Sequence, residues 1–286
     1  MAEITIVTAL FDVGRKKWTD FERDTETYLE YFKFWARLRN KVIIYTDRIT
    51  GEKVLKIREE FGLQDRTKVI VIDCIEECDP DIYQRMEKTI ANKRTVNYRK
   101  YPKNPESYSA KYNYIMLLKS WFVKNAVENG YADGMIAWLD FGYNHGGETY
   151  TNSNEFDYLW EYDFSNKIHL FLMTSLDDTP IFEIVYNMDV YFSGGVIVAS
   201  ADKWGDLWSM VRNSMYCLTQ CGFVDDDQTL MLMAYREHPE VFEIHYIEDW
   251  FLPLKIFGGN HLTVKKKKKK SQLSIFWRNF KKKYLK

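Results

Sequence analysis

The chain has 286 residues, of which 46% are hydrophobic and 16% aromatic. This length and composition allow a large core and exclude both a disordered protein and a small disulfide-stapled one. No apolar run reaches about 18 residues, so no membrane-spanning helix is predicted, and the first residues do not resemble a signal peptide. The cysteines form two C-x3-C pairs, at 74 and 78 and at 217 and 221. Zinc knuckles usually have C-x2-C with glycine or polar turn residues, which these pairs lack. We expect free thiols in a reducing cytoplasm.

The net charge of −1 hides a strong asymmetry along the chain. Residues 265–286 hold 11 of the 40 basic residues and no acidic residue. The remaining 29 basic residues face 41 acidic ones, so residues 1–264 carry a charge near −12. The two parts are therefore expected to meet different partners.

Hydrophobic periodicity, caps and breakers predict strands that alternate with helices. The region 76–105 contains three prolines and is predicted to be irregular. In chain order the elements are strand 3–11, helix 25–38, strand 41–47, helix 52–61, strand 67–73, helix 105–130, strand 134–140, strand 167–175, strand 189–200, helix 201–218, helix 225–239 and strand 241–247.

Nearly continuous apolar strands separated by helices predict an α/β fold with a mostly parallel sheet covered on both faces. We expect a single domain over 1–264, followed by the basic segment 265–286. Ligands of such sheets bind outside the carboxyl ends of the strands. Asp12, Asp47, Asp73 and Asp140 all fall at or just after predicted strand ends, so several carboxylates are expected along one rim.

Several motifs resemble one family over roughly residues 4–260. They are "ITIVTALFDVGR", "SAKYNYIMLLKSWFV", "WLDFGYNHGG" and "SGGVIVASADKW". In combination they look like the HtrL/YibB family of bacterial proteins linked to lipopolysaccharide or capsule assembly. The order of features, with an Asp-centred turn after a strand and a "DDDQ" helix start, also resembles GT-A glycosyltransferases. The resemblance implies a GT-A-like, Rossmann-like fold and a nucleotide-sugar substrate.

The turn after strand 134–140 is the position of the metal motif in that resemblance. GT-A enzymes usually carry Asp-x-Asp there, which binds Mn²⁺ or Mg²⁺ and, through the ion, the donor diphosphate. Here Asp140 is followed by Phe141 and Gly142, so the second acid is missing. Asp140 binds the metal with water and other groups, binds it weakly, or caps a turn without metal. His261 in "IFGGNH" is the candidate second ligand, and His145 is the alternative.

The resemblance also implies residues that contact the nucleotide sugar. Lys111, with Lys119 two turns further along the same helix, is the candidate basic residue, although solvated lysines are an equal alternative. Glycines inside strand 189–200 indicate a close approach by a ligand, or a bulge that serves packing alone. The expected donor-binding residues are Thr8, Ala9, Arg15, Asp47, Lys111, Ser193, Gly194 and Gly195.

The acidic run at 225–227, followed by Gln228, is the candidate catalytic segment. Inverting transfer needs a carboxylate that takes the acceptor proton, for which Asp226 or Asp225 is suited. Retaining transfer could instead use an Asp–Gln pair beside the anomeric carbon, and Asp227 and Gln228 resemble the Asp-Gln pair of retaining sugar transferases. Helix capping accounts for one of these acids but not for all of them.

The basic segment carries a helical stripe formed by Leu273, Phe276, Trp277, Phe280 and Tyr284. A basic amphipathic helix with such residues suits an anionic membrane surface. A disordered solubilising tail and a nucleic-acid contact are the alternatives. The acidic body argues against nucleic acid as a partner.

The resemblance, together with these features, implies a metal-assisted glycosyltransferase that would move a hexose from a nucleotide sugar, expected to be UDP-linked. The acceptor would be a hydroxyl of a lipopolysaccharide, lipooligosaccharide or capsule glycan, or of its lipid-linked precursor. The enzyme would lie in the cytoplasm, on the inner face of the inner membrane. A non-catalytic nucleotide-sugar or glycan-binding protein of the same fold is the alternative.

Overall fold

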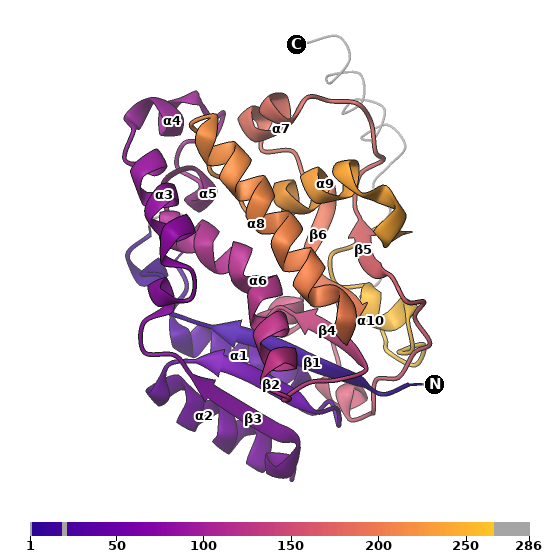
Figure 1. Ribbon diagram of the computed structural model, residues 1–286. Helices are drawn as coiled ribbons and strands as arrows, with labels where there is room; N and C mark the ends of the chain where they lie inside the picture. The colour runs from indigo at the N-terminus through magenta and orange to yellow at the C-terminus, as the bar shows by residue number, and fades with distance from the viewer. Residues whose placement is uncertain (1, 19–21, 266–286) are drawn as a thin grey trace.

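The computed structural model describes residues 2–18 and 22–265, and these form one mixed sheet flanked by helices (Figure 1). Every strand expected from the sequence is present, with ends trimmed by a few residues. The strands are β1 (Ile4–Leu10), β2 (Val42–Thr46), β3 (Thr67–Val71), β4 (Met135–Leu139), β5 (Ile168–Leu172), β6 (Phe192–Ser200) and β7 (Phe242–Tyr246). The predicted α/β class with a mostly parallel sheet is confirmed.

The strand order is β3-β2-β1-β4-β6-β5-β7, and β6 is antiparallel to both of its neighbours. Because β6 runs backwards, its first residues lie beside the carboxyl end of β4. Leu139 is paired with Val196, and the amide of Asp140 donates to the carbonyl of Gly195 at 2.9 Å. The strand with two glycines thus reaches the rim where the parallel strands end.

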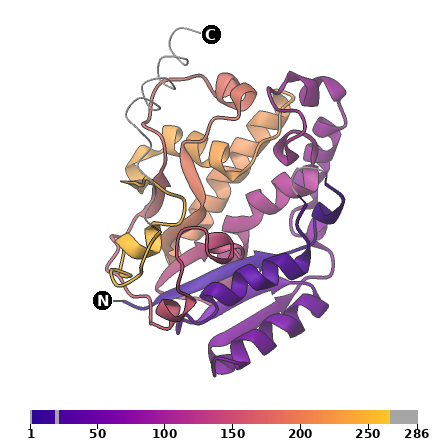
Figure 2. The same cartoon turned by 180° about the vertical axis from the view of Figure 1, so that it is seen from behind.

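Helices cover both faces of the sheet and bury two separate apolar clusters. One face is covered by α3, α6, α8 and α9, and the opposite face by α1, α2 and α10, as opposite views show (Figures 1 and 2). The helices are α1 (Thr25–Trp35), α2 (Arg48–Glu59), α3 (Pro80–Ile90), α4 (Lys93–Tyr98), α5 (Pro105–Tyr108), α6 (Ala110–Glu128), α7 (Ile181–Asn187), α8 (Trp204–Gln220), α9 (Asp227–Glu237) and α10 (Pro253–Ile256).

Side-chain caps fix where several of these helices begin. The carboxylate of Asp24 accepts from the amide of Thr27 at 2.8 Å, and Asp47 accepts from Thr50 at 2.9 Å. A cap of this kind satisfies one of the backbone N–H groups that have no partner inside the helix. The cap at Asp47 explains why α2 starts before residue 52, where the sequence alone placed it.

The prediction that the region 76–105 is irregular is wrong, because this region contains α3 and α4. Pro80 occupies the first turn of α3, where a missing N–H costs nothing, and Asp79 caps the helix through the amide of Ile82. The proline therefore marks a helix start. The short helices α7 and α10 were also not predicted.

Two predictions concern the membrane. No helix within residues 2–18 and 22–265 is long and apolar enough to cross a bilayer. The amphipathic stripe predicted between Leu273 and Tyr284 lies outside the described residues, as does all of the basic segment except Lys265. Membrane binding by that segment stays a prediction, and so does the domain boundary at residue 264.

Candidate active site

A cavity of about 420 Å³ lies at the carboxyl ends of β1 and β4. The first residues of β6 and α9, the middle of α6, the turn after β4, residues 250–251 and side chains from the segment 13–28 also line it. The volume is within the range typical of sites for small molecules and cofactors. The position agrees with the expectation that ligands of a parallel sheet bind beyond the carboxyl ends of its strands.

Lys119 of α6 forms the ionic centre of this cavity. Its side chain is buried, and Nζ lies 2.9 Å from Oδ2 of Asp227 and 3.1 Å from Oδ1 of Asp140. Nζ also donates to the carbonyl of Gly194 at 2.9 Å. Burial alone would lower the pKa of Lys119, but the two carboxylates outweigh it and raise that pKa above its ordinary value. The lysine is therefore a fixed positive charge.

Asp140 follows β4 and keeps its carboxylate at the cavity rim. The indole N–H of Trp138 donates to Oδ1 at 2.8 Å, on the same oxygen that Lys119 contacts. The side chain remains 39% exposed, so a ligand in the cavity can reach it. Two donors on one oxygen hold the carboxylate in a single orientation.

The glycines at the start of β6 have different surroundings. A Cβ added to Gly194 would lie 2.1 Å from Oδ2 of Asp227, far inside contact distance. A Cβ added to Gly195 would meet its nearest atoms, in Ser193 and Asp140, at 3.6 and 3.8 Å. Gly194 is therefore required for Asp227 to reach Lys119, which gives one of the two glycines a specific purpose.

The acidic run divides between structure and cavity. Asp225 pairs with Arg99 at 3.1 Å and accepts from the hydroxyl of Thr229 at 2.9 Å, and it does not line the cavity. Asp226 lines the cavity and caps α9 through the amide of Gln228 at 3.1 Å. Burial, followed by repulsion from Asp227 and Asp225, raises the pKa of Asp226 well above its ordinary value. Burial also raises the pKa of Asp227, although the contact with Lys119 works against it.

Arg15 supplies positive charge on another wall. Its guanidinium carbon lies 5.2 Å from the ring centroid of Trp18 and 5.9 Å from that of Tyr112, and it donates to the hydroxyl of Tyr28. Its Nε is buried and makes no hydrogen bond. An unpaired buried N–H donor beside aromatic rings is suited to an anion that enters with a flat or apolar group.

The turn after β4 has a left-handed backbone, which explains why Asn, His and two glycines follow the buried strand. Asn144 and His145 have φ of 64° and 43°, and the glycines at 146 and 147 are also left-handed. Asn144 accepts from the amides of Thr149 and Tyr150, each at 2.8 Å, which ties the turn together. The residues are those that tolerate left-handed backbone best.

The wall formed by residues 250–251 is anchored by two tyrosines. The hydroxyls of Tyr143 and Tyr150 both donate to the carbonyl of Phe251. The ring of Phe251 packs edge-on against Tyr143, with centroids 5.2 Å apart. The chain after β7 is thereby joined to the turn after β4.

The structure brings together most of the residues expected at the site. They come from five separate stretches of the chain and line one cavity. These residues are Ala9, Arg15, Asp140, Gly194, Gly195, Asp226, Asp227 and Gln228.

Three residues that were expected to bind the donor or the metal do not line the cavity, so these predictions are corrected. Lys111 pairs with Glu76 at 2.9 Å, near the surface, and does not line the cavity. It precedes Lys119 by eight residues, which is about 12 Å along a helix. Asp47 is occupied as the cap of α2. His261 is exposed, its Nε2 lies 2.9 Å from the carbonyl of Glu155, and it does not line the cavity.

Thr8 and Ser193 are buried next to lining residues and are not themselves on the cavity surface. The hydroxyl of Ser193 accepts from the amide of Gly195 at 3.3 Å, so it supports the glycine pair from behind. The hydroxyl of Thr8 is buried without a hydrogen-bond partner. His145, the alternative metal ligand, does line the cavity, where Nδ1 lies 2.9 Å from Glu148.

The cavity is also lined by Arg23, Trp250 and Phe251, which were not predicted from the sequence. No motif surrounds them, since each comes from a loop that only the folded chain brings near the rim. Lys119 was predicted only as a second choice. The residues three and four positions from Lys119 in the helix, at 115, 116, 122 and 123, are all apolar, and this was the available signal that favoured it over Lys111.

Comparisons with known proteins agree with the motifs. Residues 2–259 match the model of a family described as "Bacterial protein of unknown function (HtrL_YibB)". Protein HtrL of Escherichia coli (strain K12) is 33% identical over 279 residues, which are 91% of this chain and 94% of that protein. The crystal structure of mouse xyloside xylosyltransferase 1, in its apo form, is similar with a TM-score of 0.45 and 14% identity, covering 85% of each chain. The family match spans most of the sequence, and the chain belongs to the HtrL/YibB family.

Proposed function

We propose that this protein transfers a glycosyl group from a nucleotide sugar to a hydroxyl acceptor in the cavity around Lys119. The observation that carries the proposal is the set of charges there. A buried ammonium holds Asp140 and Asp227, while Asp226 lies on the same cavity wall with a raised pKa. Paired carboxyl groups whose environments differ are typical of sites that separate charge stabilisation from proton transfer.

Asp226 is the proposed general base. In its ionised form, a carboxylate with a raised pKa is a stronger proton acceptor than an ordinary one. As the acceptor oxygen bonds to the anomeric carbon, its proton passes to Asp226, and the bond from that carbon to the donor phosphate breaks. The nucleoside diphosphate leaves with the bonding electrons.

Positive charge is needed where that diphosphate forms. Arg15 offers its unpaired Nε, and the aromatic rings around it are suited to stack on a base or a sugar face. Lys119 keeps Asp140 and Asp227 fixed, so the cavity is charged before the substrate arrives. Such preorganisation lowers the barrier without reorganisation during the reaction.

A divalent ion, Mn²⁺ or Mg²⁺, fits Asp140 in one respect. Magnesium is often held by one or two carboxylates, with substrate phosphates and water completing its shell. Asp140 is more exposed than Asp226 and Asp227, and its Oδ2 is not the oxygen held by Trp138 and Lys119. When bound there, the ion would neutralise part of the diphosphate charge.

The finer identity of the reaction rests on the family resemblance. We infer a hexose, a UDP-linked donor and an acceptor on a lipopolysaccharide, lipooligosaccharide or capsule glycan or its lipid-linked precursor. Such an acceptor suits an enzyme on the cytoplasmic face of the inner membrane. A non-catalytic nucleotide-sugar binder is the second candidate, since the Asp-x-Asp pattern is incomplete.

The test is a panel of nucleotide sugars, screened by thermal shift with Mn²⁺, with Mg²⁺ and with chelator. A donor at 100 times its dissociation constant adds about 2.7 kcal/mol of stability. Donors that bind are then assayed for release of the nucleoside diphosphate with glycan acceptors. Asp226→Asn is expected to lower turnover by about 100-fold or more while donor binding persists.

The control for that variant is its stability as a function of pH. Because the pKa of Asp226 is raised in the folded state, ionising it costs stability as pH rises above about 4, its unfolded value. Asp226→Asn removes this cost, so the variant should be at least as stable as the native protein at pH 8. Asp47→Asn, a cap outside the cavity, should keep turnover unchanged. Full turnover by Asp226→Asn would contradict the assignment, and binding without turnover by the native protein would favour the second candidate.

A further inference from the structure

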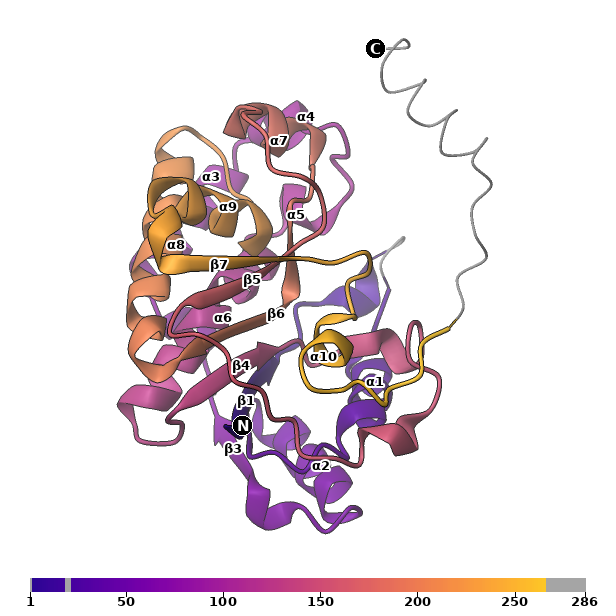
Figure 3. The ribbon, with the colours of Figure 1, turned by 90° about the vertical axis from the view of Figure 1, so that its right-hand side faces the viewer.

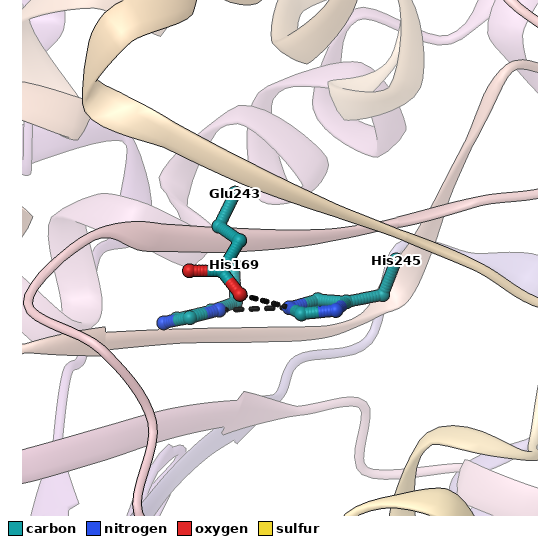
Figure 4. A group of neighbouring side chains, drawn as sticks. All are labelled: His169, Glu243 and His245. Atoms are coloured by element: carbon teal, nitrogen blue, oxygen red, sulfur yellow. Dashed lines mark hydrogen bonds and ion pairs between the residues drawn. The ribbon is translucent and has the colours of Figure 1, made fainter.

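A second group of polar side chains projects from β5 and the edge strand β7 (Figure 4), which lie side by side (Figure 3). His169 comes from β5, and Glu243 and His245 come from β7. Their ligand atoms all lie within 4.8 Å of one another. None of the three lines the cavity around Lys119.

Strand register explains why these residues meet. His169 is paired with Glu243, and Phe171 is paired with His245, in a parallel ladder. Residues two apart on a strand point to the same face, so the three side chains project together. Figure 4 shows the imidazole of His169 and the carboxylate of Glu243 converging on the ring of His245.

Ser165 orients two members of the group. Nε2 of His169 lies 3.0 Å from the carbonyl of Ser165, so that nitrogen is the donor and Nδ1 presents its lone pair. This lone pair points toward Nε2 of His245 at 2.8 Å. The hydroxyl of Ser165 donates to Oε2 of Glu243 at 2.5 Å. Metal-binding histidines and carboxylates are commonly oriented by such outer contacts, which are hydrogen bonds to a backbone carbonyl or from a hydroxyl group.

The surroundings are apolar on one side and open on the other. His169 is 1% exposed, and the ring of Phe164 packs on it with centroids 4.7 Å apart. Phe257 packs on His245, also at 4.7 Å. Glu243 and His245 are only partly buried, which leaves a path for an ion from solvent.

We propose that His169, Glu243 and His245 bind a divalent transition metal, with Zn²⁺ the best match. Two imidazoles and one carboxylate, with water in the fourth position, are a common zinc ligand set. Zinc–nitrogen bonds of about 2.0–2.1 Å in a tetrahedral site need nitrogens roughly 3.3 Å apart. The observed distance of 2.8 Å between Nδ1 of His169 and Nε2 of His245 would increase with a small rotation of the partly exposed His245.

The bound ion would join the edge strand of the sheet to its neighbour. β7 leads directly to Trp250 and Phe251 in the cavity wall, so the ion also stabilises the segment that carries them. This stabilising role does not depend on the proposed transfer reaction.

The test is titration of the chelator-treated full-length protein with Zn²⁺ alone, followed by calorimetry and by thermal shift. We expect one high-affinity zinc per chain and a raised melting temperature. His245→Ala and Glu243→Gln, at the edge strand, should weaken zinc binding by on the order of 100-fold or more, since loss of an outer contact alone costs 10- to 100-fold. His238→Ala, an exposed histidine just before β7, is the matched control and should bind zinc as the native protein does.

Two further variants separate this site from others in the chain. Replacement of all four cysteines by serine should leave the high-affinity zinc in place, which excludes the C-x3-C pairs. Asp140→Asn should also retain it, which separates it from the metal proposed in the cavity. Equal zinc affinity in His245→Ala, Glu243→Gln and the native protein would overturn the proposal. Absence of zinc binding by the native protein would reduce the group to a hydrogen-bonded histidine pair.

Discussion

Lys119 is the residue on which the geometry of the site depends. It is buried with Asp227, at 3% and 4% exposure of the two side chains. Removing one partner of such a pair leaves an uncompensated charge in a medium of low polarity, which costs far more than the pair itself contributes. The same residue therefore controls the positions of both carboxylates and the stability of the fold around them.

Lys119→Met is expected to destabilise the protein by about 3–5 kcal/mol, because Asp227 keeps a buried charge without a cation. Lys119→Met combined with Asp227→Asn should recover most of that loss, since no charge then remains unpaired there. Lys111→Met is the matched control. Its pair with Glu76 is at the surface, with side chains 38% and 30% exposed, so the change should stay within about 1 kcal/mol. Urea unfolding of the four proteins measures the differences, and equal stability of Lys119→Met and the native protein would contradict the ionic centre.

At this scale the sequence predicted Asp140, Asp226, Asp227 and the glycines, because each sits at a strand or helix terminus that the sequence marks. It did not separate Lys111 from Lys119. Residues of α6 are buried all along its length, against the sheet and against α8, so the helix lacks a clear polar face, and the apolar residues three and four positions from Lys119 were the available signal. Only the structure shows that Lys119 is buried and that Lys111 lies near the surface.

At the scale of elements, the reversed strand β6 is the decisive feature. Its antiparallel course brings Gly194 under Asp227 at the start of α9 and Gly195 beside Asp140 at the end of β4. Three elements far apart in sequence thus share one point of contact. A strand of the opposite direction would place its Ala-Ser end at this rim instead.

Gly194→Ala is expected to destabilise the protein by about 1–3 kcal/mol, the usual cost of overpacking, and to displace Asp227 from Lys119. Its Cβ would lie 2.1 Å from the carboxylate oxygen. Gly195→Ala is the comparison, because its Cβ would make only ordinary contacts at 3.6 and 3.8 Å. Thermal unfolding of both variants measures the difference. Equal melting temperatures would show that Asp227 does not occupy the space above Gly194.

Local pattern predicted the elements better than their arrangement. Apolar runs located the inner strands, because a strand covered on both faces must be apolar throughout, whereas the edge strands β3 and β7 also carry polar residues. The same runs carry no signal of direction, so the antiparallel course of β6 was not predicted. Nor did pattern predict the edge-strand cluster, although Glu243 and His245 stand two apart in a predicted strand and hence on one face.

At the scale of the whole molecule, charge is distributed unevenly along the chain. Residues 1–264 carry a charge near −12, and the segment that follows them holds the excess of lysine. The acidic part is repelled by an anionic bilayer. Any attraction to such a surface must therefore come from the basic segment, and it should be sensitive to salt.

Replacement of the lysines at 266–270 by glutamine in the full-length chain should weaken binding to anionic vesicles on the order of 100-fold or more. Each basic residue near such a surface contributes about 1 kcal/mol. Sedimentation with vesicles that contain anionic lipid, compared with neutral vesicles and with duplex DNA, measures the effect. Binding that is unaffected by the replacement, or that favours DNA, would contradict a membrane role for the segment.

The hydrogen bond from the amide of Asp140 to the carbonyl of Gly195 has one more consequence. It continues the β4–β6 ladder by one residue into the rim, so Asp140 and the two glycines of β6 are held by the sheet. A one-residue slip between these strands would reverse every side chain along them. Asp140 and the glycines can therefore not rearrange independently of the sheet. A substrate binds to a site that is already assembled, so little conformational entropy is lost on binding.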